Sequence, residues 1–295
     1  MAKEFKSIRV GQFSESPVLA VARALGLDDK YQVTWETTRV PSSPGQFQML
    51  RDGEIDLAIT SPDNVILYAT TSKNPLDEQL GLSFLRPVDR GLGLALYTSP
   101  KIATVNDFHG ATLGVDVMSS GFAILLLSML RQLGVDLQQV TFEAVGATPK
   151  RVEAVVAGGI HGTILNAESA VAAEESGLKR WATSVDVTPH YLGTVLAQLA
   201  GPLSDETKAF LELWEEGTHV ILSSQADELI ELLGRAAPTL ASAAYVSILQ
   251  SEDFGLLETN VISLQQLSAL AAIRTEAAVY APTEDQLRTL LGENL

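Results

Sequence analysis

The sequence of 295 residues contains no cysteine. A chain without cysteine cannot use a thiol nucleophile, cannot form a disulfide and cannot bind a metal through thiolates. Histidine is also scarce: the chain has 4, and no two of them stand at the spacing of an HxxxH or HExxH zinc motif. We therefore expect neither a metal site nor a cofactor.

Positive charge and long hydrophobic runs are lacking too. Lys and Arg number 20 against 36 Asp and Glu, which gives a formal net charge of −16. Nucleic acids and anionic membranes are bound through basic patches, so we expect no nucleic-acid partner. The longest apolar run, residues 122–127, is far too short to span a bilayer, so we expect no membrane insertion.

The first residues, MAKEFKSIRVGQF, contain no apolar segment of the kind that forms the centre of a signal peptide. Two locations remain as alternatives. The protein is cytoplasmic if Met1 is the native start, and periplasmic or extracellular if an export signal has been removed.

Residues 53–69, GEIDLAITSPDNVILYA, show the pattern around which the rest of the chain is organised. Residues 57–59 form a short apolar run that predicts a buried strand. Ser61 and Pro62 then predict an immediate helix start, because serine caps helices well and proline suits the first helical position. In open α/β sheets, ligands bind at the edge where strands end and helices begin.

The same order recurs at Ser16-Pro17, Ser43-Pro44 and Thr148-Pro149, each of which follows a predicted strand. One interpretation of each site is an ordinary helix start in which the serine or threonine is only a cap. The other is that several helix N-termini point free N–H groups and positive dipole ends into one crevice.

The order of predicted elements indicates two lobes. Alternating strands and helices fill residues 1–97, a second such series follows, and residues after 204 are helical. We expect lobe 1 to comprise 1–97 plus 193–295, with the C-terminal helices covering it, and lobe 2 to comprise 98–192. Residues 92–97 and 192–199 are predicted strands that cross between the lobes.

Three stretches carry a family resemblance: LRDGEIDLAITSPDNVILYA, FHGATLGVDVMSSGFAILLLSMLRQLGVD and VGATPKRVEAVVAGGIHGTILN. Their order resembles the type II periplasmic-binding-protein fold, and more narrowly the solute-binding proteins of nitrate, sulfonate, taurine and thiamine-precursor ABC importers. The resemblance implies a two-lobed α/β fold that closes by a hinge motion on a small-molecule ligand between its lobes, with the two crossing strands as the hinge. It also implies an ABC importer permease as partner.

The fold leaves a second function open, because relatives that share it include enzymes. The alternative is a cytosolic lyase, decarboxylase or hydrolase that acts on a small aromatic or carboxylate compound. One such relative, an aromatic sulfinate desulfinase, relies on a cysteine, so its chemistry cannot be carried over to this chain. No motif in the sequence assigns a catalytic residue.

The candidate ligand-binding residues are mostly polar side chains that follow predicted strands. They are Gln12, Phe13, Ser14, Glu15, Ser42, Ser43, Gln46, Thr60, Ser61, Asp63, Asn64, Asp116, Ser119, Ser120, Gly121, Phe122, Thr148, Arg151, Asn166, Glu168 and His190. We expect the ligand to be a small anionic or aromatic organic compound. The helix N-termini and Arg151 favour an anionic group such as a carboxylate or sulfonate, whereas Glu15, Asp63 and Asp116 could hold an amine. We expect the Asn64 amide to bind the ligand directly.

Overall fold

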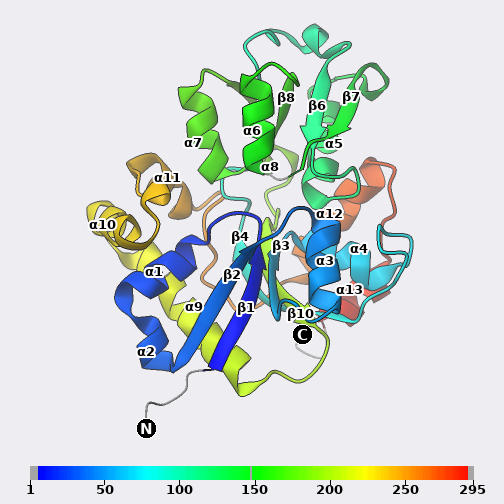
Figure 1. Ribbon diagram of the computed structural model, residues 1–295. Coiled ribbons are helices and arrows are strands. Elements are labelled where there is room, and N and C mark those ends of the chain that lie inside the picture. Colours follow the sequence, from blue (N-terminus) through cyan, green and yellow to red (C-terminus); the bar gives the residue numbers. More distant parts are fainter. Residues whose placement is uncertain (1–5, 147, 292–295) are drawn as a thin grey trace.

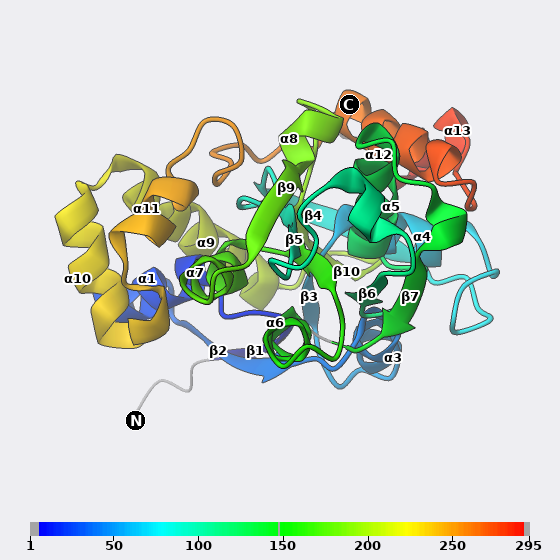
Figure 2. The same ribbon diagram turned by 90° about the horizontal axis from the view of Figure 1, so that it is seen from above.

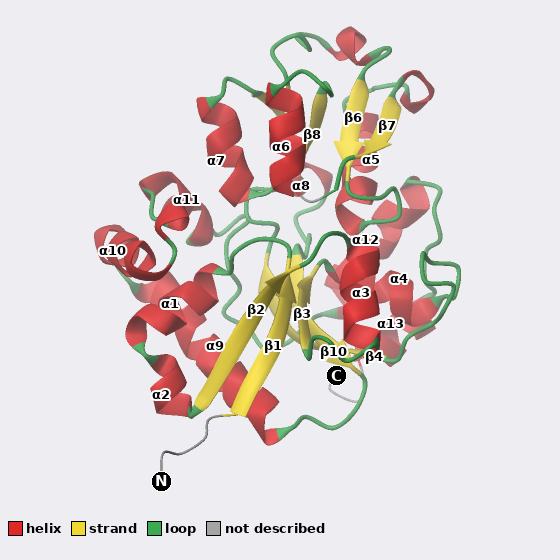
Figure 3. Ribbon diagram, viewed as in Figure 1, coloured by secondary structure: helices red, strands yellow, loops and turns green. Residues whose placement is uncertain are grey.

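The computed structural model describes residues 6–146 and 148–291, and it contains two five-stranded sheets with helices packed around each (Figure 1). Each sheet with its helices forms one lobe, and the two lobes lie one above the other (Figure 3). We call the lobe with the first sheet lobe 1 and the other lobe 2. The expected two-lobed α/β architecture is confirmed.

The sheet of lobe 1 has the strand order β2-β1-β3-β10-β4. β1 is parallel to both β2 and β3, whereas β10 is antiparallel to β3 and β4. A late strand therefore lies in the middle of a sheet built from the first part of the chain. The strands are β1 Lys6–Gln12, β2 Val33–Arg39, β3 Leu57–Thr60, β4 Leu82–Asp89 and β10 Thr194–Leu199.

The sheet of lobe 2 has the order β7-β6-β8-β5-β9, with β6 parallel to its two neighbours and β5 antiparallel to its own. Its strands are β5 Ala95–Thr98, β6 Thr112–Val115, β7 Thr141–Ala144, β8 Gly162–Leu165 and β9 Lys179–Thr183. Its helical elements are η1 Val105–Phe108, α5 Gly121–Gln132, η2 Leu137–Gln139, α6 Thr148–Val156, α7 Ala167–Glu175 and α8 Ser184–Val187.

The helices of lobe 1 come from both ends of the chain. The early ones are α1 Pro17–Leu25, α2 Leu27–Tyr31, α3 Ser43–Arg51 and α4 Pro62–Thr70. The late ones are α9 Asp205–Ser223, α10 Ala226–Ala236, η3 Pro238–Leu240, α11 Ala243–Leu249, α12 Leu264–Glu276 and α13 Glu284–Leu291. α9 and α10 pack on α1, and α13 packs on α4 and β4, so the C-terminal helices cover lobe 1 as predicted (Figure 2). In addition, α11 contacts α7 and α12 contacts α5, both in lobe 2.

The predicted helix starts need two corrections. Ser16 and Ser61 cap α1 and α4 as expected, but α3 is capped by Ser42, whose hydroxyl accepts a hydrogen bond from the N–H of Gly45. Ser43 is therefore the first helical residue rather than the cap. Thr148 is likewise the first residue of α6 rather than the residue before it, and its hydroxyl accepts a hydrogen bond from the Arg151 guanidinium, one turn further on.

The predicted crossing strands are shorter than expected. Gly91, Leu92 and Gly93 all have positive φ angles of 109°, 43° and 67°, which a strand does not allow, so β5 starts only at Ala95. We call residues 90–94 and 188–193, which connect the two sheets, the hinge segments. β5 pairs only in the sheet of lobe 2, which places the first change of sheet before Ala95. The division into 1–97 plus 193–295 and 98–192 stays a prediction.

Candidate functional site

The two lobes enclose a cleft, which we call the interlobe cleft. It consists of a larger hollow of about 90 Å³ and a smaller one of about 30 Å³. Both hollows are lined by Phe13 and Ser61 from lobe 1 and by Phe122 and Thr148 from lobe 2. Because the same side chains border both, the two hollows adjoin and form one site between the lobes.

The structure brings many of the predicted residues to this cleft. Those that line it are Phe13, Ser14, Glu15, Thr60, Ser61, Asn64, Asp116, Ser120, Phe122, Thr148, Arg151 and Asn166. Those found elsewhere are Gln12, Ser42, Ser43, Gln46, Asp63, Ser119, Gly121 and His190. The side chain of Glu168 lies outside the part of the structure that is described. That any of these residues binds a ligand stays a prediction.

Three of the residues away from the cleft have clear structural roles. Gln46 is fully buried, and its side-chain amide donates to the carbonyls of Gly11 and Ile59 at 3.0 Å each, which ties the ends of β1 and β3 together. The exposed ring of His190 contacts the Gln265 amide at 2.9 Å. The third residue, Asp63, forms a buried ion pair.

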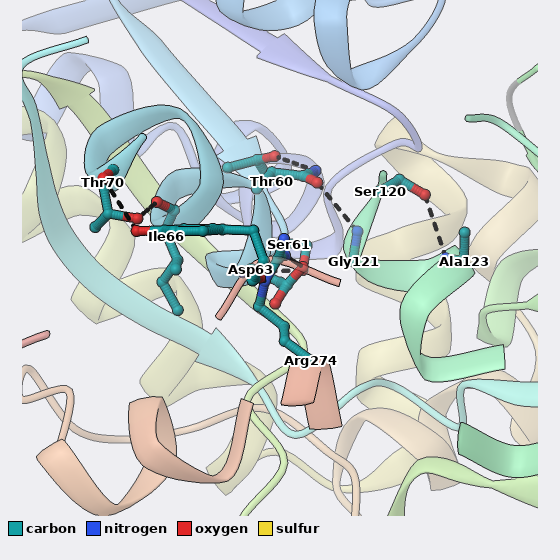
Figure 4. A network of polar contacts seen from close by, with 11 residues as sticks. Thr60, Ser61, Asp63, Ile66, Thr70, Ser120, Gly121, Ala123 and Arg274 are labelled. Carbon is teal, nitrogen blue, oxygen red and sulfur yellow. Dashed lines mark hydrogen bonds and ion pairs between the residues drawn. The ribbon is translucent and has the colours of Figure 1, made fainter. Parts of the chain in front are cut away.

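Asp63 and Arg274 form that pair at 2.5 Å between α4 and α12, with side chains 4% and 1% exposed (Figure 4). Burial raises the pKa of Asp63 and the Arg274 guanidinium opposes that shift. The carboxylate of Asp63 is thus already paired with the Arg274 guanidinium. We therefore assign a structural role to Asp63, which holds α12 against the N-terminus of α4 beside the cleft.

The N-terminus of α4 touches the N-terminus of α5 directly across the lobes. Asn64 Oδ1 accepts a hydrogen bond of 3.1 Å from the backbone N–H of Gly121, while its Nδ2 donates to Thr60 Oγ1 at 3.3 Å. A Cβ on Gly121 would lie 2.4 Å from Ser61 Oγ, so only glycine permits this approach (Figure 4). The Asn64 amide thus lines the cleft, but both of its polar atoms already have protein partners.

A second interlobe contact lies on the α1 side of the cleft. Asn166 Nδ2, in lobe 2, donates to Ser14 Oγ, in lobe 1, at 3.2 Å. Within the described residues the other amide atom, Asn166 Oδ1, is buried and has no hydrogen-bond partner. The lobes are therefore closed on each other, and one acceptor is left unsatisfied beside the cleft.

Arg151 lines the smaller hollow from α6 and is 2% exposed. Its guanidinium donates to Thr163 Oγ1, Thr148 Oγ1 and the carbonyls of Gly146 and Ile164, which uses four of its five N–H groups. Burial lowers the pKa of Arg151 to about 10, while the charge of Asp116 raises it. Arg151 therefore stabilises lobe 2 through these hydrogen bonds and still presents positive charge to the cleft.

Sequence reasoning missed several lining residues, of which Asp89, the last residue of β4, carries charge. Asp89 is 1% exposed, and its Oδ1 accepts a hydrogen bond of 2.7 Å from the N–H of Gly91. Burial raises the pKa of Asp89 to about 6, although hydrogen bonds from the Thr194 side chain and Gly91 lower it. Its position at the carboxyl end of β4 is a signal that could have found it. Trp214 and Tyr245 reach the cleft from the C-terminal helices, and no local pattern indicates that.

Two kinds of site were looked for among the residues that the structure describes: metal sites and membrane-spanning helices. The described residues include no group of three or more His, Cys, Asp or Glu side chains that could hold a metal ion. Among the same residues, no helix has the length and apolar character that crossing a membrane requires.

Comparison with known proteins was informative only at the level of structure. No family model and no curated protein matches the sequence. The alkanesulfonate-binding protein SsuA from Xanthomonas axonopodis pv. citri, bound to MOPS, superposes with a TM-score of 0.75 at 15% identity, over 98% of this chain and 99% of that one. The ligand-binding component of an ABC-type import system from Staphylococcus aureus gives 0.73 at 16% identity, over 98% and 100%.

The periplasmic nitrate-binding protein NrtA from Synechocystis PCC 6803 gives a TM-score of 0.74 at 11% identity, over 97% of this chain and 85% of that one. These similarities cover nearly the whole chain, whereas the identities are too low to transfer a ligand. They confirm the resemblance to the periplasmic-binding-protein fold of nitrate and sulfonate importers.

Proposed function

We propose that this chain is a binding protein for a small organic compound and that its two lobes close on the compound in the interlobe cleft. The observation that carries the proposal is that the cleft is lined from both lobes, which touch directly through Asn64–Gly121 and Ser14–Asn166. A ligand that contacts both lobes adds to these bonds, so it favours the closed arrangement over an open one.

The lining favours an anionic or aromatic compound. Arg151 supplies the positive charge of the smaller hollow, together with hydroxyl groups of Ser120 and Thr148 that can donate to an anion. The rings of Phe13 and Phe122 border both hollows, where a flat apolar group can pack between them. The compared proteins described as alkanesulfonate-binding and nitrate-binding have anionic ligands, which supports the same choice.

We also propose an ABC importer permease as partner and a location outside the cytoplasm. The Staphylococcus aureus structure is described as part of an ABC-type import system, and the Synechocystis protein is described as periplasmic. No structure reported above is described as an enzyme, and no observation in the cleft favours the lyase, decarboxylase or hydrolase alternative over binding.

The test is native mass spectrometry of freshly purified protein, combined with thermal-shift measurements against organic anions and aromatic acids. The variant is Phe122→Ala, which removes a half-buried ring from the cleft, and the control is Val156→Ala on α6, whose side chain is 56% exposed. We expect a bound compound in the wild type and the control. We expect its affinity to fall about tenfold or more in Phe122→Ala, a loss of about 1.4 kcal/mol.

The proposal fails if the wild-type mass shows only the polypeptide and no compound raises its melting temperature. It also fails if Phe122→Ala binds as tightly as the control variant does, because the compound would then occupy another surface.

A further inference from the structure

Asp89 is a buried acid without a positive partner. It lines the larger hollow of the interlobe cleft with 1% of its surface exposed. Its carboxylate bonds the Gly91 N–H and the Thr194 side chain, and no lysine, arginine or histidine among the described residues contributes to its electrostatics. Burying an unpaired carboxylate costs several kcal/mol in folding, so packing alone does not explain this residue.

The charges of the other acids near the cleft are compensated by basic side chains or by water. Asp63 is neutralised by Arg274 at 2.5 Å, and Asp116 attracts Arg151 across the smaller hollow. Glu15 is only half-buried, so water can solvate its charge. Among the described acids that line the cleft, Asp89 is therefore the fully buried one without a basic partner.

The rest of the larger hollow fits a cation as well. Its described lining includes no lysine, arginine or histidine. The buried Asn166 Oδ1 is an acceptor without a partner. The rings of Phe13, Phe122, Trp214 and Tyr245 line the same hollow, and aromatic faces attract organic cations.

We propose that Asp89 binds a cationic group of the ligand, and that the ligand class is an organic ammonium whose apolar part packs on the aromatic rings of the larger hollow. The inference rests on the proposed function, because it concerns the same cleft. It goes beyond that function by assigning a positive charge to the part of the ligand in the larger hollow, whereas Arg151 lines the smaller one. An ammonium supplies up to three N–H donors, which match the acceptors of Asp89 and Asn166.

The position of Asp89 also links this charge to the hinge. Its backbone carbonyl accepts a hydrogen bond of 2.9 Å from Gly193 of the second hinge segment, while its side chain holds Gly91 of the first. Tyr191, whose buried hydroxyl has no partner within the described residues, lies in the field of both Asp63 and Asp89. A cation bound at Asp89 would therefore lie where the two hinge segments meet.

The test compares ammonium compounds with neutral alcohols of the same skeleton: phenethylamine against 2-phenylethanol, and benzylamine against benzyl alcohol. Binding is measured by isothermal titration at about pH 8, where these amines are protonated and Asp89 is ionised. The variant is Asp89→Asn, which keeps an acceptor for Gly91. The control is Asp56→Asn, at the partly exposed ion pair with Arg9.

We expect the wild type to bind each ammonium about tenfold or more tightly than its alcohol, as one charged hydrogen bond implies. Asp89→Asn should remove this preference while changing the affinity for the alcohols less than about twofold, since only a polar contact is altered. Asp56→Asn should retain the preference.

Equal binding of ammonium and alcohol by the wild type overturns the inference and leaves the proposed function intact. So does a preference that survives in Asp89→Asn, or one that Glu15→Gln removes in its place. If no ammonium binds the wild type at millimolar concentration, the inference is also wrong. The proposed function is then judged separately, by native mass spectrometry and Phe122→Ala. The comparison of ammonium and alcohol binding by the wild type needs no variant, so the inference can be overturned even if Asp89→Asn does not fold.

Discussion

Asn64 Oδ1 accepts a hydrogen bond from the backbone N–H of Gly121, so the start of α4 in lobe 1 is joined to the start of α5 in lobe 2. The bond is buried and is 3.1 Å long. An asparagine that the sequence predicts to bind ligand thus has a structural role, because it holds the lobes together beside the cleft.

Asn64→Ala should therefore destabilise the closed arrangement. The variant leaves the buried Gly121 N–H without its acceptor, which costs about 1–3 kcal/mol. We expect a lower melting temperature and a larger radius of gyration in small-angle scattering of the ligand-free protein. Thr60→Val, which removes only the partner of Asn64 within lobe 1, should leave the radius of gyration unchanged. Equal dimensions for Asn64→Ala and wild type would count against an interlobe role.

Asp63→Asn should be strongly destabilising, because it leaves the Arg274 guanidinium buried and unpaired. Breaking a buried ion pair by removing one partner costs about 3–5 kcal/mol, which urea unfolding would detect. The double variant Asp63→Asn with Arg274→Met should recover part of the loss, since it removes the uncompensated charge. A single variant as stable as the wild type would show that the pair is not needed.

The pKa of Asp89 predicts an unusual dependence of stability on pH. Burial raises this pKa from 3.8 to about 6, so the folded protein holds a proton that the unfolded chain releases. The contribution of Asp89 to the free energy of unfolding is fully present below about pH 4 and is lost as the pH rises through about 6. Asp89→Asn should therefore be more stable than wild type at about pH 7, by about 3 kcal/mol for two pKa units.

That difference should shrink towards about pH 4, where the wild-type carboxyl is protonated. Tyr191, the titratable group that faces Asp89 from the second hinge segment, has a pKa raised by burial and stays neutral throughout. Urea unfolding of both proteins across this range checks the sign. A wild type that gains stability relative to Asp89→Asn as the pH rises would contradict it.

Gly193→Ala should disturb the hinge. A Cβ at this position would lie 2.4 Å from Asp89 Oδ1 and from the backbone N and Cα of Gly91, so the two hinge segments would have to separate. Such overpacking costs about 1–3 kcal/mol. Gly201→Ala is a matched control, because no atom lies within 4 Å of its added Cβ. Equal melting temperatures for the two variants would show that the hinge segments tolerate separation.

Local pattern was enough to predict most strands, helices and the two lobes, because apolar runs and Ser-Pro starts act over a few residues. The same reasoning placed Phe13, Ser61, Phe122 and Thr148 near one cleft, where the structure has them. Such reasoning works where the carboxyl ends of parallel strands meet at one sheet edge.

Other features depend on contacts between distant segments. The pairing of Asp63 with Arg274 joins residues far apart in the sequence. It explains why an acid that was predicted to bind ligand is bonded to an arginine of the protein instead. Trp214 and Tyr245 approach the cleft only because the C-terminal helices fold back beside α1 and α7. Leu92 was predicted in a strand because it is apolar, yet the neighbouring glycines let the chain turn there.

If the two lobes close on a ligand, the distance between them must shorten when the ligand binds. Because the chain has no cysteine, Gln48→Cys on α3 and Lys150→Cys on α6 add only the two intended spin-label sites, both exposed (Figure 1). The compound retained by the purified protein is removed by unfolding and refolding and is then added back. Pulsed electron resonance should show a broad distance distribution without the compound and a shorter, narrower one at saturation. An identical distribution in both samples would show that the lobes do not close on the compound.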